Sequence, residues 1–260
     1  MLNELLKQDT IKLVEPGHKY VVKQAEHLRF SSVTTFIHDF FEGFDAEKVA
    51  NKLSGTGKYI NTSVEELLAD WEQSGIDGTK VHNQIEDAIL QGHPFKAVKT
   101  NNLEAKTIHA LEWLSYVIEP HYKLFPEVKI YSIKYQLAGT IDLLVYNTLT
   151  DQWLIVDWKT NKKINKYGFG GAMGKNPATR LLPDCHHSHY TLQLSLYQYL
   201  LKLEYGIEIE DRILVHLKPK KTNKFPMGIT EYWLDYLKVN VENMLVQRLE
   251  LKEANELFTI

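Results

Sequence analysis

The stretch AGTIDLLVYNTLTDQWLIVDWKTNKK, residues 138–163, decides the fold because it predicts a β-hairpin with charged residues where burial is expected. Two runs rich in Val, Ile, Leu and Trp flank Thr148–Asp151, whose composition is typical of a tight turn. If Asn147 faces Gln152 across this turn, the register of the whole hairpin follows.

That register places Asp142 directly across from Asp157. Opposed residues have Cβ atoms about 4.5–5.5 Å apart, where two carboxylates repel unless a positive charge lies between them. Alternation along the strand puts Lys159 on the same face as Asp157. The pattern indicates a Mg²⁺ or Mn²⁺ site in which Lys159 orients a nucleophile or offsets phosphate charge. A structural Asp157–Lys159 ion pair is the alternative.

The rest of the chain predicts an α/β fold. A mostly helical region extends to about Gly92, and its segments 31–41 and 63–71 open on Ser or Thr residues typical of helix caps. The expected order afterwards is a helix, three strands, a helix, a strand and a helix. These elements are predicted at residues 101–118, 128–135, 140–146, 153–158, 189–203, 211–219 and 231–254.

Composition limits the classes of function. The chain has 260 residues, 44% of them hydrophobic, and lacks the run of about 18 apolar residues that a membrane helix needs. We therefore expect a soluble, cytoplasmic protein with no membrane partner, and the single Cys185 fits a reducing compartment. Because the net charge is −3, nucleic-acid binding needs a local patch. The candidates for phosphate contacts, which a solvated loop would equally explain, are Lys162, Lys163, Lys166, Lys175 and Arg180.

Two pairs of segments carry a resemblance to a known family. The residues Gly139–Asp142, followed by Asp157–Thr160, resemble motifs of the RecB-like branch of the PD-(D/E)XK nuclease superfamily. Gln193 and Tyr197, four apart on the helix after the hairpin, are similar to a further motif, as is the upstream His82. All occur in the family's order, which is much more specific than any one of them.

The resemblance implies a role for each matching residue. Asp142 and Asp157 would be metal ligands, with His82 as a further ligand and Lys159 as the catalytic lysine. Gln193 would support the active centre, with Tyr197 one turn away, and Glu86 and Glu127 would be supporting acids. By themselves, a lone histidine and Tyr197 more often belong to the surface or the core.

The resemblance also implies a fold and an activity. We expect one nuclease domain over residues 1–260: a helical amino-terminal elaboration (1–77), a restriction-endonuclease-like αβββαβ core (78–218) and a helical closure (219–260). The implied activity is a Mg²⁺- or Mn²⁺-dependent DNA exonuclease of replication, recombination or repair. An endonuclease or RNA nuclease, or a non-catalytic nucleic-acid-binding module, remains the alternative.

Similarity to two groups of relatives extends these expectations. Ser32-Val33-Thr34 is similar to a segment of the mitochondrial genome maintenance exonuclease, so Ser32 and Thr34 are candidate nucleic-acid contacts. The overall pattern is also similar to phage-encoded nucleases, which would act in the host cytoplasm. A recombination or replication protein as a partner is left open.

Some signals depart from the family or compete with it. Ile141 stands where the superfamily has its proline, the second acid is Asp157 rather than glutamate, and one cysteine does not support an iron–sulfur cluster. The Cys185–His189 segment lacks zinc-site spacing. The glycine-containing segments GTGKY, AMGKN and GFGGAM lack the spacing of nucleotide loops, so no nucleotide cofactor is expected.

Overall fold

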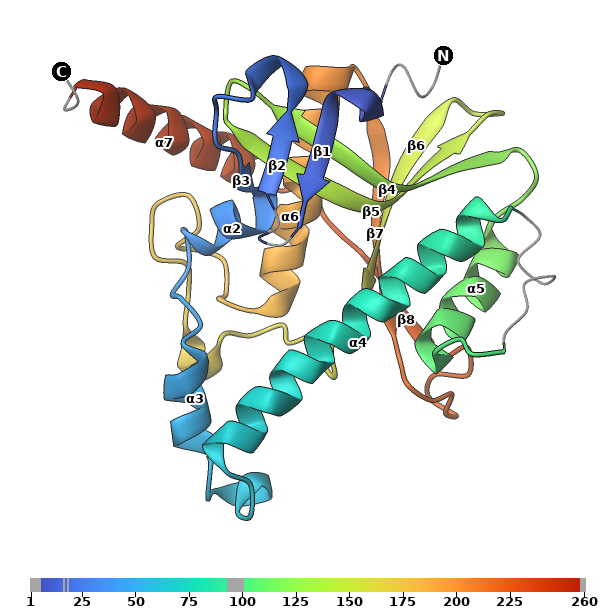
Figure 1. Ribbon diagram of the computed structural model, residues 1–260, viewed down its shortest axis with the longest axis vertical. Coiled ribbons are helices and arrows are strands. Elements are labelled where there is room, and N and C mark those ends of the chain that lie inside the picture. Colours follow the sequence, from blue (N-terminus) through green and yellow to red (C-terminus); the bar gives the residue numbers. More distant parts are fainter. Residues whose placement is uncertain (1–5, 16, 18, 93–100, 258–260) are drawn as a thin grey trace.

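A computed structural model describes residues 6–15, 17, 19–92 and 101–257. Its centre is a mixed six-stranded sheet with helices on both faces (Figure 1). The strands are β3 (Ser31–Ser32), β4 (Tyr122–Ser132), β5 (Leu137–Asn147), β6 (Gln152–Lys159), β7 (Ile209–Leu217) and β8 (Ile229–Trp233). The predicted α/β class with a mixed central sheet flanked by helices is confirmed.

Strand β5 is the centre of the sheet's pairing. Antiparallel β4 covers one edge of β5 along its whole length. The other edge carries two strands in succession, because parallel β3 pairs with Leu137–Ala138 and antiparallel β6 pairs with Leu143–Asn147. The segment Gly139–Asp142 therefore lies between two ladders. Strand β7 runs parallel to β6, and β8 is antiparallel to β7.

The predicted hairpin register is confirmed. Asn147 faces Gln152 and Leu143 faces Val156, with the turn at residues 148–151 between β5 and β6. The Asn147 side chain closes this turn, since its Oδ1 accepts the Leu149 N–H at 3.0 Å. The next residues beyond the ladder are Asp142 and Asp157, one on each strand.

The described part of the chain has six helices: α2 (Val33–His38), α3 (Ala46–Leu53), α4 (Val64–Leu90), α5 (Ala105–Val117), α6 (His186–Leu200) and α7 (Lys238–Leu257). Short 3₁₀ turns cover Gln8–Thr10, Lys23–Ala25, Gly57–Tyr59 and Phe169–Gly171, and a π turn, Leu201–Tyr205, follows α6. The predicted Ser caps are confirmed: Ser32 caps α2, and Ser63 forms a capping box with Glu66 on α4.

Two apolar layers hold the helices to the sheet. Helices α2, α6 and α7 pack on one face and α4 and α5 on the other. Along β6, Ile155 belongs to the first layer, whereas Val156 and Trp158 belong to the second. Asp157, which alternates with them, therefore faces α6.

The prediction missed strands at both ends of the chain. Strands β1 (Ile11–Val14) and β2 (Lys19–Val22) form a separate hairpin, and β3 joins the main sheet, so the amino-terminal region is less helical than predicted. The prediction of a helix from residue 231 is wrong at its start, because β8 extends through Trp233 and α7 begins at Lys238. These strands have two to five residues each, too few for a clear period in the sequence.

Gly139 is a point of close approach between β5 and α6. A Cβ atom built there would lie 2.6 Å from Cε1 of the Tyr197 ring, which is 3% exposed. We expect Gly139→Ala to lower the free energy of unfolding by about 1–3 kcal/mol through overpacking.

Chemical denaturation measures this change, and Gly75→Ala is the matched control. Gly75 lies inside α4, and a Cβ atom added there would have no neighbouring atom within 4 Å, so alanine should be neutral or stabilising by up to about 1 kcal/mol. Equal effects of the two substitutions would contradict the close approach at Gly139.

Candidate active site

Asp142 lies where the β5–β6 ladder ends. Beyond the Leu143–Val156 pair, the Asp142 carboxylate takes the place of a backbone acceptor, since its Oδ2 accepts the Trp158 N–H at 2.8 Å. This charge-assisted hydrogen bond fixes the carboxylate against the neighbouring strand. Asp142 is thus held at the segment of β5 that lies between its two ladders.

Glu127 lies beside Asp142 on the neighbouring strand. The β4–β5 ladder pairs Pro126 with Leu143 and Val128 with Ile141, so Glu127 is level with Asp142. Its φ of 49° is in the left-handed region, which non-glycine residues adopt rarely and which is enriched at functional sites. The irregular backbone marks this position on an otherwise regular strand.

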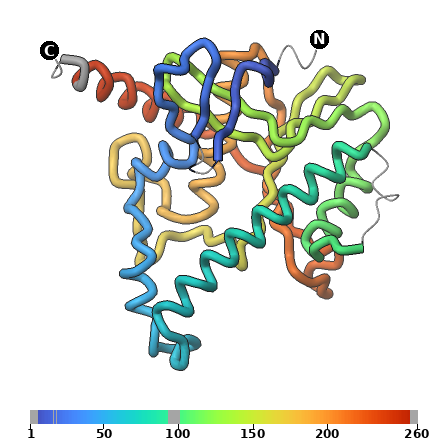
Figure 2. The backbone as a smooth tube through the Cα atoms, viewed as in Figure 1, coloured from blue at the N-terminus to red at the C-terminus, as the bar shows by residue number. Residues whose placement is uncertain are grey.

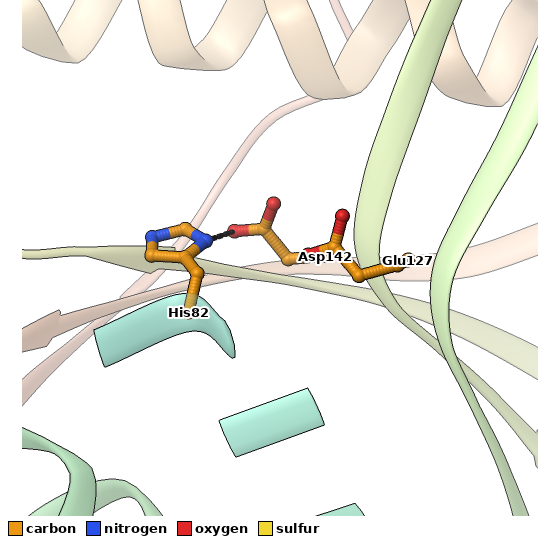
Figure 3. Close-up of side chains that lie close together, drawn as sticks. All are labelled: His82, Glu127 and Asp142. Atoms are coloured by element: carbon orange, nitrogen blue, oxygen red, sulfur yellow. Dashed lines mark ion pairs between the residues drawn. The ribbon is translucent and has the colours of Figure 1, made fainter. Parts of the chain in front are cut away.

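His82 approaches these acids from α4. Its Nδ1 lies 3.5 Å from Asp142 Oδ2. One ligand atom each from His82, Glu127 and Asp142 lie within 4.8 Å of one another, and Figure 3 shows the three side chains pointing together from α4 and two strands. Within the described residues this is the one group of three or more His, Cys, Asp or Glu side chains gathered so closely.

Close packing brings α4 to the site. A Cβ atom at Gly78, one turn before His82, would lie 2.9 Å from Oγ1 of Thr160, which directly follows β6. Glycine therefore lets the helix pass near the end of the strand. Glu86, one turn after His82, adds its negative charge to the surroundings of Glu127 without belonging to the three-residue cluster.

Asp157 and Lys159 form a buried ion pair. Lys159 Nζ lies 2.7 Å from Asp157 Oδ2, and the two side chains are 15% and 2% exposed. Burial opposes the charge on Lys159, but Asp157 and Asp142 outweigh it and raise the pKa of the ammonium group, which stays protonated. Asp157 is paired in this way and is not a member of the His82–Glu127–Asp142 cluster.

Gln193 connects Asp157 to α6. Its Nε2 donates to Asp157 Oδ1 at 3.5 Å and to the Tyr197 hydroxyl at 3.1 Å. Gln193 and Tyr197 share one face of α6, as their spacing predicts. Burial raises the pKa of Tyr197 well above its ordinary value, so its hydroxyl remains a neutral partner for the Gln193 amide.

Burial and neighbouring negative charge raise the pKa of two acids at the centre of the site, Glu127 and Asp157. Burial, followed by the charges of Asp142 and Glu86, raises the pKa of Glu127 to about 8. Burial also raises the pKa of Asp157, an effect that Lys159 opposes and Asp142 increases. Near neutral pH, Glu127 therefore holds a proton that a bound cation would displace.

Tyr190 is a site residue that the sequence did not single out. The Lys159 ammonium lies 4.5 Å from the centre of the Tyr190 ring, and the Tyr190 hydroxyl donates to Asn161 Oδ1 at 2.9 Å. Its only signal in the sequence is its place one turn before Gln193 on α6. The ring thus adds a cation–π contact to the ion pair that Lys159 makes with Asp157.

The other predicted contact residues lie outside this cluster. Ser32 Oγ accepts the Thr35 N–H at 3.0 Å and bonds to Thr34, which is exposed. The five basic side chains after β6 are all exposed: Lys162, Lys163, Lys166, Lys175 and Arg180. The site therefore consists of the compact His82–Glu127–Asp142 cluster, a buried ion pair and a separate basic segment.

The histidines at the start of α6 have separate partners. His189 Nε2 lies 2.9 Å from Asp184 Oδ1, His186 stacks on Tyr190, and His187 meets Tyr232 edge to face. Burial lowers the pKa of all three. They do not point at one common centre.

A family model described as the PD-(D/E)XK nuclease superfamily matches residues 17–254. The chain belongs to this superfamily, whose nucleases use divalent metal ions and act on DNA, and the observed sheet is consistent with its restriction-endonuclease-like fold. A search of curated proteins finds no match. Within the described residues, no helix has both the length and the apolar character of a membrane span.

The side chains present fit a divalent cation. Two carboxylates and one imidazole supply oxygen and nitrogen ligands, a set suited to Mg²⁺ or Mn²⁺. The raised pKa of Glu127 agrees with this, because burial and then the charges of Asp142 and Glu86 disfavour its ionised form in the absence of a cation.

We expect His82→Ala to weaken Mn²⁺ binding by about tenfold or more. Isothermal titration calorimetry of the folded protein measures this directly. His121→Ala is the matched control, since His121 also lies 3.5 Å from a carboxylate, that of Glu119, and is similarly exposed. Equal weakening in both variants would show that His82 has no special part in binding.

We expect Glu127→Gln to flatten the pH dependence of stability in EDTA. The folded protein keeps the Glu127 proton up to about pH 8, whereas the ordinary value is 4.5, so wild-type stability falls as the pH rises between these values. Denaturation at about pH 5 and about pH 9 should show a smaller loss for the variant. An unchanged loss would place the Glu127 pKa near its ordinary value.

Proposed function

We propose that this protein is a Mg²⁺- or Mn²⁺-dependent exonuclease that hydrolyses phosphodiester bonds from DNA ends in replication, recombination or repair. The observation that carries the proposal is the buried Asp157–Lys159 pair beside the His82–Glu127–Asp142 cluster. An ammonium group and several carboxylates gathered at one level of the sheet are the parts that metal-assisted phosphodiester hydrolysis needs.

The proposed metal ligands are His82, Asp142 and Asp157, joined on geometric grounds by Glu127, with Glu86 as a nearby supporting acid. A cation held there would lower the pKa of a bound water and offset charge on the scissile phosphate. The Trp158 N–H and His82 hold the Asp142 carboxylate before any ligand arrives. The chain's part is thus to fix the ligands in advance.

Lys159 is the proposed catalytic lysine. It keeps its proton, and it contacts both the Asp157 carboxylate and the Tyr190 ring. A fixed ammonium group can orient the attacking water or stabilise negative charge that develops on the phosphate. Gln193 holds Asp157, and Tyr197 in turn bonds to Gln193, so α6 supports the ion pair.

Assignment to the RecB-like branch rests on the ordered set of Asp142, Asp157-Trp158-Lys159, Gln193 and Tyr197 with His82 upstream. Action from DNA ends and similarity to phage nucleases rest on the same resemblance. We extend the proposal to one nuclease domain over residues 1–260, with its core at residues 78–218.

The decisive assay follows linear single-stranded and duplex DNA, labelled at the 5′ or 3′ end, with Mg²⁺, Mn²⁺ or EDTA. We expect metal-dependent shortening that Lys159→Ala and Asp142→Asn each reduce by about 10²–10³-fold or more. Lys202→Ala is the control, because Lys202 forms a surface ion pair with Glu208.

The form of the DNA separates the alternatives. Closed circular DNA should stay intact while linear DNA is consumed, and cleavage of circles would instead indicate an endonuclease. Full activity of Lys159→Ala would contradict the proposed site. Salt-sensitive binding without any metal-dependent cleavage would indicate a non-catalytic nucleic-acid-binding module.

A further inference from the structure

The segment that follows strand β6, residues 160–183, has an unusual composition. It carries five basic residues and no acidic one in a chain whose net charge is −3. We call it the basic loop. In Figure 2 its path runs from the end of β6, in yellow, to the start of α6, in light orange.

The basic loop is folded and anchored. Its Thr179 side chain is buried and donates to the Phe40 carbonyl at 2.9 Å, and the Lys175 N–H donates to the same carbonyl at 3.0 Å. Near its start, the Asn165 carbonyl accepts the His187 N–H at 3.0 Å. Residues between these anchors are therefore presented on a defined backbone.

Large apolar side chains of this loop face the solvent. Phe169 is 95% exposed and Tyr167 is 85% exposed. Phe169 lies in a closed turn in which the Gly171 N–H donates to the Gly168 carbonyl and the Ala172 N–H to the Phe169 carbonyl. An aromatic ring exposed to solvent gains no stabilisation from burial. Two such rings on a folded loop that also carries lysines indicate a contact surface.

The loop is also connected to the site. Its residue Asn161 accepts the hydroxyl of Tyr190, whose ring contacts Lys159. Asn165 N–H donates to His186 Nδ1 at 3.4 Å, and the His186 ring stacks on Tyr190. A DNA strand at Lys159 would thus have the basic loop as a direct neighbour.

We propose that the basic loop binds unpaired nucleotides of the strand being cleaved, with its cations on the phosphates and with Tyr167 and Phe169 stacked on bases. Positive charge interleaved with exposed aromatic rings matches a single strand, whose bases have free faces, better than a duplex, whose bases stack on one another. The proposal rests on the proposed nuclease function and specifies its substrate as single-stranded DNA ends.

The first test is binding of labelled oligodeoxythymidine in EDTA, measured by fluorescence anisotropy. We expect Tyr167→Ala and Phe169→Ala each to weaken binding by about 5- to 150-fold, while Phe169→Trp retains it. Leu149→Ala, which removes a 75% exposed side chain at the far turn of the hairpin, is the control and should have no effect. Lys162→Ala should lower the salt slope by about 0.7.

An abasic scan tests the stacking itself. At one or two positions, an abasic nucleotide should weaken binding to the wild type but not to Phe169→Ala or Tyr167→Ala, because the ring and the base form one interaction. A duplex of equal length should bind wild type and both variants alike.

Unchanged affinity of the Tyr167 and Phe169 variants for the oligonucleotide would overturn the proposal, as would equal losses for single strand and duplex. A concentration-dependent oligomer that these variants disrupt, with DNA binding intact, would assign the surface to a second copy of the chain and also overturn it.

Because binding is measured in EDTA, wild type that binds through these rings but never cleaves would refute the nuclease function alone. Cleavage unaffected by both variants would refute the loop's role alone.

Discussion

Repulsion among carboxylates at one level of the sheet is the constraint on which the site depends. Glu127, Asp142 and Asp157 stand at the same level on three neighbouring strands. Two carboxylates about 4 Å apart repel by about 4 kcal/mol at an effective dielectric constant of about 20. A domain's whole stability is about 5–15 kcal/mol, so such a group persists only with compensation.

The chain's own cations and hydrogen-bond donors offset only part of this repulsion, and they are divided unequally among the three acids. Lys159 neutralises Asp157, and the Trp158 N–H and His82 face Asp142. Among the described residues Glu127 is left without a comparable partner, and burial, followed by the charges of Asp142 and Glu86, raises its pKa to about 8. The surrounding helices hold this arrangement: α4 brings His82, and α6 brings Gln193 and Tyr190. The position left for a divalent cation is between the acids and His82.

Much of this arrangement could be predicted because it depends on local periodicity. Alternation along the strands and the Thr148–Asp151 turn define the hairpin register, and the spacing of Gln193 and Tyr197 defines their shared helix face. Other features depend on tertiary structure. The sequence names Glu127 only as a supporting acid, and neither its left-handed backbone nor its place beside His82 and Asp142 has a signal in the sequence.

Short strands and aromatic contacts could also not be predicted from the sequence. Strand β8 continues without a break in hydrophobic pattern into the region of α7, and its strand pairing depends on β7. In the sequence, Tyr190 is one of several aromatic residues on a buried helix, and only the structure shows its ring beside Lys159. Sequence motifs therefore named most of the polar side chains that the structure brings together, whereas the fold determines which of them meet.

Proton release on metal binding tests the central claim most directly. Titrating Mn²⁺ into the protein calorimetrically, in buffers of different ionisation enthalpy, counts the protons displaced. If the cation relieves the carboxylate repulsion, close to one proton should be released at about pH 7 and much less at about pH 9, above the pKa of Glu127. Mn²⁺ binding with no proton release at about pH 7, or with the same proton release at both pH values, would contradict a site in which the cation offsets repulsion among the acids.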